Sequence, residues 1–348
     1  MKKIKVLHTE WSDGWGGQEI RIINEMKALR DKGVELFLAT RPHAKIKEKA
    51  QEEGFKVFDI PFKSNFDLGS IFKLVKIIKK NNINIVNTHS GKDTWVGGFA
   101  AKIAGAKFIR TRHLSNPINP SRLNFINELA DFIITTGEGV KKAMIKNNRI
   151  NPEKIISIPT GVNEKIFDPK KYNQTESRKK LNLPLNKKIV GFLGILRSVK
   201  NPYLFINIAK EFPNILFVLG GNGPLENDLK NYAKNLKNIK FLGFVDSPTF
   251  LSAIDILLLT SKNEGVPQSV IQALLMEKDV IASNVGSIKD LKKENNFLLA
   301  NEKMEFVNYL DKLLKGKIKL DNKRESMKDF TIDRMSKKIL NVYKKVLN

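Results

Sequence analysis

The segment DILLLTSKNEGVPQSVIQALLMEKDVIAS, residues 255–283, contains the pattern of a strand, a loop and a helix in succession. Residues 255–261 are an apolar run typical of a buried strand, residues 262–266 are polar, and residues 267–276 have helical spacing. Pro267 opens the predicted helix, a position that proline favours. The pattern predicts a strand-to-helix crossover with Glu264 in its loop and Gln272 in its helix. These two polar residues are either ordinary crossover residues or part of a ligand site.

The same alternation of apolar runs and helical periods extends over the whole chain. A polar stretch near residue 165 separates two series of predicted strands. They are 4–8, 36–40, 56–61, 83–89, 108–111, 132–136 and 155–159, then 189–193, 215–220, 239–244, 256–260, 280–283 and 297–300. The alternation predicts an α/β fold with two doubly wound, Rossmann-like domains, followed by an amphipathic helix near the end of the sequence. Ligands of such domains bind beyond the carboxyl ends of the strands, and the cleft between the domains is the expected site.

Composition narrows the class of protein. The sequence has 348 residues, 41% of them hydrophobic and 28% charged, which is typical of a soluble protein with two domains. No apolar run is long enough to cross a bilayer or to serve as a signal peptide, so we expect a cytoplasmic protein. The absence of cysteine excludes disulfides and thiolate metal sites.

The net charge of +25 favours anionic partners such as nucleic acid, phosphate-bearing ligands or membrane surfaces. A composition bias toward lysine, asparagine and isoleucine explains the charge equally well. The sequence has no arginine-rich run and no basic strand interleaved with aromatic residues, so we expect no nucleic-acid partner.

Two predicted strand-to-helix loops of the first domain carry residues suited to a ligand. Gly16 and Gly17 precede a helix whose N–H groups can approach an anion closely. His89 and His113 fall at predicted strand ends, and His8 is placed similarly. A lone histidine at such a position is most often structural, but several at one edge favour a site. The chain has no GxGxxG and no HExxH, which argues against a nicotinamide fold and a zinc site.

The loop GFLGILRSVKNP of the second domain contains Gly194, which allows a turn, followed by Arg197 and Lys200. Two cations three residues apart in such a loop suit a diphosphate, although a solvated loop is the simpler interpretation for a chain rich in lysine. The segment LGGNGP is interpreted as a tight turn.

Taken in order, several segments resemble the family 4 glycosyltransferases, which use nucleotide sugars, retain the sugar's configuration and have the two-domain GT-B fold. These segments are WGGQE, ADFIITTGEGVKK, IISIPTGVNEKIF, GFLGILRSVKNP, LGGNGP, FLGFV and SKNEGVPQSVIQAL. The resemblance implies an acceptor-side domain at residues 1–165, a donor-side domain at 166–330 and a terminal helix at 331–348 that crosses back to the first domain.

The resemblance also implies roles for the residues above. Gly16 and Gly17 match a glycine loop near the donor. His113 matches a histidine that contacts the donor sugar, with His89 a further possible contact to the sugar or the acceptor. Arg197 and Lys200 match a cationic pair that neutralises the diphosphate, in a loop that includes Gly194.

In the second domain, Glu264 matches the first acid of the family's Glu-x7-Glu motif, which touches the transferred sugar. Gly265, Val266 and Pro267 match the residues that approach the phosphates. Gln272 stands where the second acid, which binds the ribose diol, is expected. An amide has one acceptor oxygen where a carboxylate has two, so this change bears on nucleotide choice.

The resemblance implies sugar transfer from a nucleotide-diphosphate sugar to a hydroxyl of a glycan or lipid-linked acceptor in cell-envelope polysaccharide synthesis, without metal or cofactor. A non-catalytic nucleotide-sugar-binding protein is the alternative. Residues 66–80 combine apolar side chains with lysines, which is compatible with peripheral contact with an anionic membrane or with a core helix that has a solvated basic face. The apolar set is Phe66, Leu68, Ile71, Phe72, Val75 and Ile78, and the basic set is Lys73, Lys76, Lys79 and Lys80.

Overall fold

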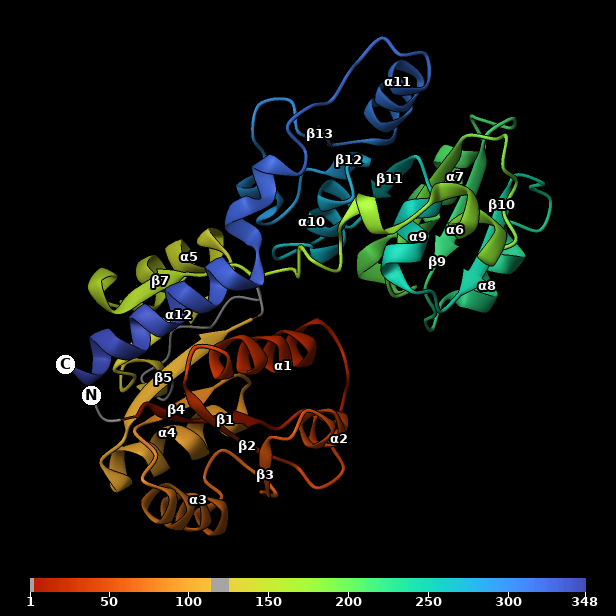
Figure 1. Ribbon diagram of the computed structural model, residues 1–348. Coiled ribbons are helices and arrows are strands. Elements are labelled where there is room, and N and C mark those ends of the chain that lie inside the picture. The colour runs from red at the N-terminus through yellow and green to blue at the C-terminus, as the bar shows by residue number, and fades with distance from the viewer. Residues whose placement is uncertain (1–2, 114–124) are drawn as a thin grey trace. The chain divides into compact units, whose positions relative to one another are not determined.

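The computed structural model describes residues 3–113 and 125–348. The chain divides into two compact units. Unit 1 comprises Met1–Gly161 together with Ile332–Asn348, and unit 2 comprises Val162–Thr331. Each unit contains one parallel sheet flanked by helices, so the predicted α/β architecture is confirmed (Figure 1).

Unit 1 is built on a seven-stranded sheet with the order β3-β2-β1-β4-β5-β6-β7. Its strands are β1 (Lys5–Glu10), β2 (Glu35–Thr40), β3 (Lys56–Asp59), β4 (Ile85–Thr88), β5 (Lys107–Arg112), β6 (Phe132–Thr135) and β7 (Ile155–Ser157). Its helices are α1 (Gly17–Arg30), α2 (Lys45–Glu52), α3 (Leu68–Asn81), α4 (Lys92–Ala104), α5 (Glu138–Asn148) and α12 (Ile332–Leu347).

Neighbouring residues of each strand of unit 1 point to opposite faces of the sheet, and each face has its own apolar core. Val6 of β1 packs with Ile22 of α1, whereas Leu7 packs with Leu74 of α3. Helices α1, α2 and α12 therefore cover one face and α3 and α4 the other (Figure 1).

Helix α12 completes unit 1 although it follows all of unit 2 in the chain. Its apolar residues Ile339 and Tyr343 are buried in the core beneath α1. The Lys32 ammonium donates to Asp333 Oδ1 at 2.8 Å, which ties the start of α12 to the end of α1. The predicted return of the terminal helix to the first domain is confirmed.

Unit 2 has a six-stranded sheet with the order β10-β9-β8-β11-β12-β13. Its strands are β8 (Ile189–Leu193), β9 (Leu216–Gly220), β10 (Ile239–Gly243), β11 (Ile256–Leu259), β12 (Asp279–Ser283) and β13 (Leu298–Ala300). Its helices are α6 (Gln174–Lys180), α7 (Pro202–Ala209), α8 (Glu226–Tyr232), α9 (Ser247–Ala253), α10 (Gln268–Leu275) and α11 (Lys303–Leu314).

Both sheets reverse their winding direction once. The reversal falls between β1 and β4 in unit 1 and between β8 and β11 in unit 2. In open parallel sheets the carboxyl ends of the strands at this switch point form the usual binding crevice. The fold thus indicates one candidate ligand-binding region in each unit, at its switch point.

One prediction about an element is corrected, and one of two alternatives for another is supported. Pro267 is the extended residue before α10 (φ −72°, ψ 117°) and the helix begins at Gln268, so the predicted helical start at Pro267 is one residue early. In α3, Ile71, Val75 and Ile78 are buried in the core of unit 1, because they lie on one face at helical spacing. These three residues are therefore not available to a membrane.

Candidate functional site

The switch point of unit 2 brings together two of the predicted site residues. Lys200, in the loop after β8, places its Nζ 2.6 Å from Oε1 of Glu264, in the loop after β11. The Ser261 hydroxyl donates to the same carboxylate oxygen at 2.6 Å. The Glu264 side chain is only 8% exposed and that of Lys200 21%, so the pair is largely withdrawn from water.

The backbone around Glu264 is held by close contacts. The Lys262 N–H donates to the Val199 carbonyl at 2.8 Å, which joins the loops after β11 and β8. Gly286 has φ +58°, and a Cβ at this position would lie 1.8 Å from the Glu264 carbonyl oxygen. Only glycine fits there without displacing the loop.

The loop that carries Arg197 packs on the turn predicted from LGGNGP. A Cβ on Gly221, whose φ is +130°, would lie 2.1 Å from the Gly194 carbonyl oxygen, and the Leu196 N–H donates to the Asn222 carbonyl at 3.0 Å. This turn thus packs against the loop that carries Arg197 and supports its backbone.

The other predicted residues of unit 2 have less contact with one another. Arg197 is exposed, and its carbonyl accepts from the Lys200 N–H at 2.9 Å. Gly265 and Val266 are half-buried directly before Pro267 and α10, so they adjoin the positive end of that helix. Gln272 lies half-buried in the second turn of α10.

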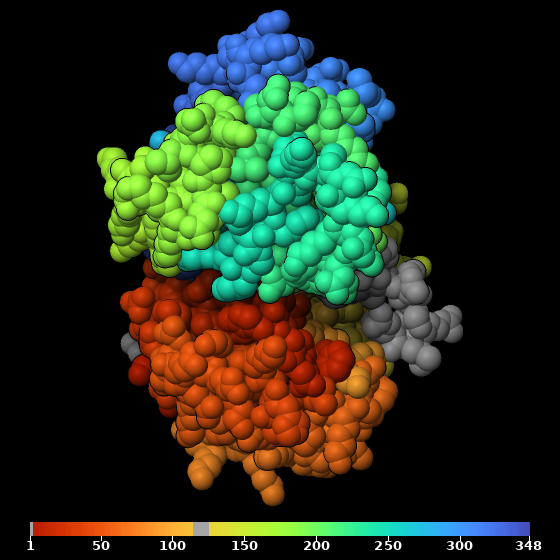
Figure 2. Space-filling view, turned by 90° about the vertical axis from the view of Figure 1, so that its right-hand side faces the viewer, coloured from red at the N-terminus to blue at the C-terminus, as the bar shows by residue number. Residues whose placement is uncertain are grey.

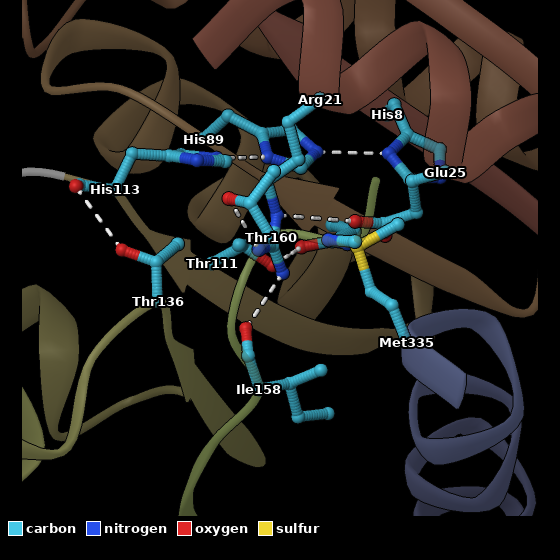
Figure 3. A network of polar contacts seen from close by, with 12 residues as sticks. His8, Arg21, Glu25, His89, Thr111, His113, Thr136, Ile158, Thr160 and Met335 are labelled. Atoms are coloured by element: carbon cyan, nitrogen blue, oxygen red, sulfur yellow. Dashed lines mark hydrogen bonds and ion pairs between the residues drawn. The ribbon is translucent and has the colours of Figure 1, made fainter. Parts of the chain in front are cut away.

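The switch point of unit 1 brings three histidines into one hydrogen-bonded row. His8 Nδ1 lies 2.8 Å from His89 Nε2, and His89 Nδ1 lies 2.8 Å from His113 Nε2. Figure 3 shows the three rings side by side, linked by these bonds. His89 and His113 directly follow β4 and β5, as predicted, whereas His8 lies inside β1 rather than at its end.

Burial sets the charge state of these rings. Burial lowers the pKa of His8 to about 3. The pKa values of His89 and His113 lie well below the ordinary value because of burial and then nearby positive groups, which include Arg21 and Arg110. All three rings are therefore neutral near pH 7.

A buried charged cluster from α1 lies beside the histidines, and the sequence analysis missed it. Arg21 donates from Nη1 to Thr160 Oγ1 at 2.9 Å and from Nη2 to the Ile158 carbonyl at 3.0 Å (Figure 3). Its Nε lies 3.8 Å from Glu25 Oε2. Burial raises the pKa of Glu25 to about 7. The spacing of Arg21 and Glu25 is equally typical of an exposed ion pair, so the sequence carried no signal of their burial.

Glu10, at the end of β1, is a second group that the sequence analysis missed. Its Oε1 accepts from the Ser12 N–H at 2.8 Å and from the Ser90 hydroxyl at 2.5 Å, and Gln18 donates to Oε2. Burial and then the charge of Asp93 raise the pKa of Glu10 to about 7. Because Gln18 directly follows the predicted Gly16 and Gly17, these bonds hold the start of α1 at the same sheet edge.

Among residues 3–113 and 125–348 there is no group of three or more His, Cys, Asp and Glu side chains arranged to hold a metal ion. The described part of the chain also contains no helix that is both long enough and apolar enough to span a membrane.

Two doubly wound units and a closing terminal helix define the class of GT-B glycosyltransferase folds, and solved structures agree. A glycosyltransferase from Rickettsia africae ESF-5 is similar over 100% of both chains, with TM-score 0.89 and 21% identity. HepE from Anabaena, in complex with UDP-glucose, is similar over 98% of this chain and 100% of its own, with TM-score 0.83 and 19% identity.

Family models match both halves of the sequence. Residues 15–165 match the model described as Glycosyltransferase Family 4, and residues 173–333 match Glycosyl transferases group 1. The chain therefore belongs to glycosyltransferase family 4, as its motifs predicted.

Curated relatives cover most of the chain. One from Escherichia coli, a UDP-Gal:α-D-GlcNAc-diphosphoundecaprenol α-1,3-galactosyltransferase, is 28% identical over 86% of this chain and 82% of its own. The O-antigen biosynthesis glycosyltransferase WbnH of the same species is 28% identical over 84% and 85%. A processive diacylglycerol α-glucosyltransferase from Acholeplasma laidlawii is 24% identical over 79% and 82%.

Proposed function

We propose that the protein transfers a sugar, with retention of configuration, from a nucleotide-diphosphate sugar to a hydroxyl of a lipid-linked or glycan acceptor in O-antigen-type synthesis. The observation that carries the proposal is the Lys200–Glu264 pair, 2.6 Å apart at the switch point of unit 2 beside the start of α10. This position suits a diphosphate and the sugar attached to it.

The leaving diphosphate gains negative charge as its bond to the sugar breaks. An ammonium group has three N–H donors, and the bond from Lys200 to Glu264 uses one of them. The remaining donors, the exposed Arg197 fork and the N–H groups at the start of α10 can stabilise that charge. Glu264 is held by Lys200 and Ser261, and it can accept from a hydroxyl of the sugar through Oε2.

The two cations Arg197 and Lys200 also support transfer without a metal ion or cofactor. A divalent cation commonly neutralises a diphosphate leaving group, and fixed side-chain cations can do the same. We expect full transfer activity in EDTA. Activity that disappears in EDTA and returns with Mg²⁺ would contradict this part of the proposal.

The names of relatives and neighbours support the substrate class. The Escherichia coli relative is named for UDP-galactose and a diphosphoundecaprenol acceptor, the Acholeplasma relative for diacylglycerol, and HepE is bound to UDP-glucose. We therefore infer a UDP-sugar donor and an acceptor that carries a lipid. Within this proposal His113 contacts the sugar with His89 behind it, Gly16 and Gly17 adjoin the donor, and Gln272 contacts the ribose.

Donor binding is tested by thermal shift with UDP-, GDP-, ADP- and CDP-sugars. A ligand stabilises the folded state in proportion to RT ln(1 + [L]/Kd), so the matching nucleotide should give the largest shift. Slow hydrolysis of the selected donor would separate an enzyme from a binding protein. Equal shifts with all four nucleotides would contradict the donor assignment.

The roles of the cations are tested with Arg197→Ala and Lys200→Ala. We expect each to lower kcat by about 100- to 1,000-fold, the usual effect of removing one donor to a developing negative charge. Lys234→Ala, which removes an exposed lysine elsewhere in unit 2, is the matched control. Near wild-type rates for both test variants would overturn the assignment.

We further propose that unit 1 meets an anionic membrane at the cytoplasmic face through one surface. This apolar-basic surface consists of Phe66, Leu68 and Phe72, which are 62%, 65% and 59% exposed, with the exposed Lys63, Lys73 and Lys76 around them. The orange part of the chain, which includes this surface, lies at the lower edge of the view in Figure 2. The Phe66 ring rests on Trp95, with ring centroids 5.2 Å apart, so an apolar side chain is held outward beside cations.

Charge complementarity favours an anionic bilayer as the occupant of the apolar-basic surface, since each lysine near such a surface contributes about 1 kcal/mol. Flotation with phosphatidylglycerol and phosphatidylcholine vesicles tests it. We expect binding to the anionic vesicles only, and its loss in the Phe66→Ser/Phe72→Ser variant. Met304→Ser, which changes a side chain that is 57% exposed in α11, should float like wild type. The proposal would be contradicted if wild type and both variants floated equally well, or if wild type floated with neither kind of vesicle.

A further inference from the structure

The histidine row of unit 1 allows only two proton arrangements. A neutral imidazole carries one proton, and each bond in the row joins Nδ1 of one ring to Nε2 of the next. If His89 carries its proton on Nδ1, it donates to His113 and accepts from His8. If it carries the proton on Nε2, both bonds reverse. The three rings therefore share one tautomer, either all Nδ1–H or all Nε2–H.

Only two arrangements exist because all three rings are neutral, and burial together with nearby positive groups keeps them neutral. His8 is fully buried in β1, and His89 is 2% exposed. The pKa values of all three rings are lowered by burial, and those of His89 and His113 also by nearby positive groups. A row with an extra proton would place a cation beside Arg21 and Arg110 in a buried site.

The far end of the row distinguishes the two arrangements. His8 Nε2 is buried and has no hydrogen-bond partner among the described residues. The all-Nε2–H arrangement would bury an N–H donor there without an acceptor, which folded proteins rarely tolerate. The all-Nδ1–H arrangement leaves only a lone pair at this atom.

We propose that the row His8–His89–His113 is fixed in the all-Nδ1–H tautomer, so that His113 is a neutral hydrogen-bond donor through Nδ1. His8 and His89 are then positioning residues, because the bond made by one ring nitrogen fixes the proton on the other. The functional part rests on the proposed function. There, His113 donates to an oxygen of the donor sugar and cannot accept a proton at Nδ1.

The tautomer is measured directly by NMR of protein labelled with ¹⁵N-histidine, without any donor present. The chain has four histidines, and His43 is exposed outside the row, so its signals are identified in a His43→Asn variant. We expect protonated Nδ1 and bare Nε2 for His8, His89 and His113. A proton on Nε2 of His89 or His113, or a doubly protonated ring, would overturn the proposal.

Variants of His8 test whether the far end sets the tautomer. The amide nitrogen of asparagine takes the place of Nδ1, so His8→Asn keeps a donor to His89, whereas the carboxylate of His8→Asp offers only acceptors there. We expect His89 and His113 to remain Nδ1–H in the first variant and to become Nε2–H in the second. Unchanged spectra for both variants would show that His8 does not position the row.

Variants of His113 test the direction of donation. Asparagine offers a donor near the position of Nδ1, and glutamine offers one near the position of Nε2. We expect His113→Gln to lose about 10- to 100-fold more kcat than His113→Asn, the usual effect of one hydrogen bond to a polar group. The reverse order would contradict donation through Nδ1. The spectra need no substrate, so failure of the row and failure of the proposed function are separable: the first appears in the spectra, the second in the donor screen.

Discussion

At the scale of single residues, unit 1 encloses titratable groups whose protonation is set by burial. Glu25 Oε1 lies 3.4 Å from the Tyr343 hydroxyl and 3.4 Å from Asn87 Nδ2, and Oε2 lies 3.8 Å from Arg21 Nε. Burial outweighs the attraction of Arg21, and the pKa of Glu25 rises from 4.5 to about 7. Such groups make the folded state sensitive to pH.

The sign of this effect follows from proton binding. Between pH 4.5 and about 7 the folded state keeps a proton on Glu25 that the unfolded state has released. Its contribution to stability is therefore full below pH 4.5 and is lost as the pH rises through 7. Glu10 acts in the same direction, whereas His8, whose pKa is lowered to about 3, favours the folded state as the pH rises to 6.5.

Glu25 and His8 change the stability with pH in opposite directions, so the effect of Glu25 is isolated by comparing wild type with Glu25→Gln. We expect the free energy of unfolding of wild type to fall, relative to this variant, by up to about 3 kcal/mol between pH 4.5 and pH 8. Urea unfolding at the two pH values measures it, with the exposed Glu48→Gln as control. A constant difference would show that Glu25 titrates alike in both states.

Gln272 is the residue at which the chain departs from the family motif. If residue 272 contacts the ribose, as proposed, a carboxylate there could accept both ribose hydroxyls, so Gln272→Glu should bind the selected nucleotide as tightly or up to about tenfold more tightly. Isothermal titration with the nucleotide diphosphate measures this. A marked loss of affinity would show that this position of α10 reads its ligand in another way.

At the scale of elements, loop shape depends on a few glycines. Gly286, after β12, has φ +58° and would bring a Cβ to 1.8 Å from the Glu264 carbonyl oxygen. We expect Gly286→Ala to displace the Glu264 loop and lower both the melting temperature and kcat. Gly316→Ala is the matched control, because its φ is +67° but nothing lies within 4 Å of the added Cβ. Equal effects of the two variants would assign the loss to backbone strain alone.

The elements themselves were largely predictable. Each predicted strand is a parallel strand of one of the two sheets, because helices on both faces of such sheets bury most of their apolar runs. The sequence also predicted the strand-to-helix loops that carry Lys200 and Glu264, since the carboxyl ends of parallel strands share one edge. It did not predict the 2.6 Å contact between these two side chains, because the pairing of β8 with β11 joins residues 64 positions apart.

The buried cluster of unit 1 was not predictable for a similar reason. Arg21 bonds to Thr160, 139 positions away, and Glu25 meets Tyr343, 318 positions away. Charged residues at helical spacing are usually solvated, and nothing local distinguishes these. Their burial follows from α12, which covers α1 only in the folded chain.

At the scale of the whole molecule, Tyr343 joins distant parts of the sequence. Its hydroxyl accepts from Asn87 Nδ2 at 3.1 Å and lies 3.4 Å from Glu25 Oε1. We expect Tyr343→Phe to lower the free energy of unfolding by about 1–3 kcal/mol, because buried polar atoms lose a partner. Tyr232→Phe, which removes a hydroxyl from an exposed side chain, should change it by less than about 0.5 kcal/mol. Similar effects of both variants would contradict a special role for Tyr343.

The return of α12 to unit 1 also has a consequence for the order in which the two units fold during synthesis. Unit 2 is continuous, from Val162 to Thr331, and its whole core is translated before α12. The apolar core beneath α1 still lacks Ile339 and Tyr343 at that moment. We therefore expect the first unit, although most of it is translated earlier, to keep an exposed apolar face until the last helix is made, so that it completes its fold no earlier than the second unit.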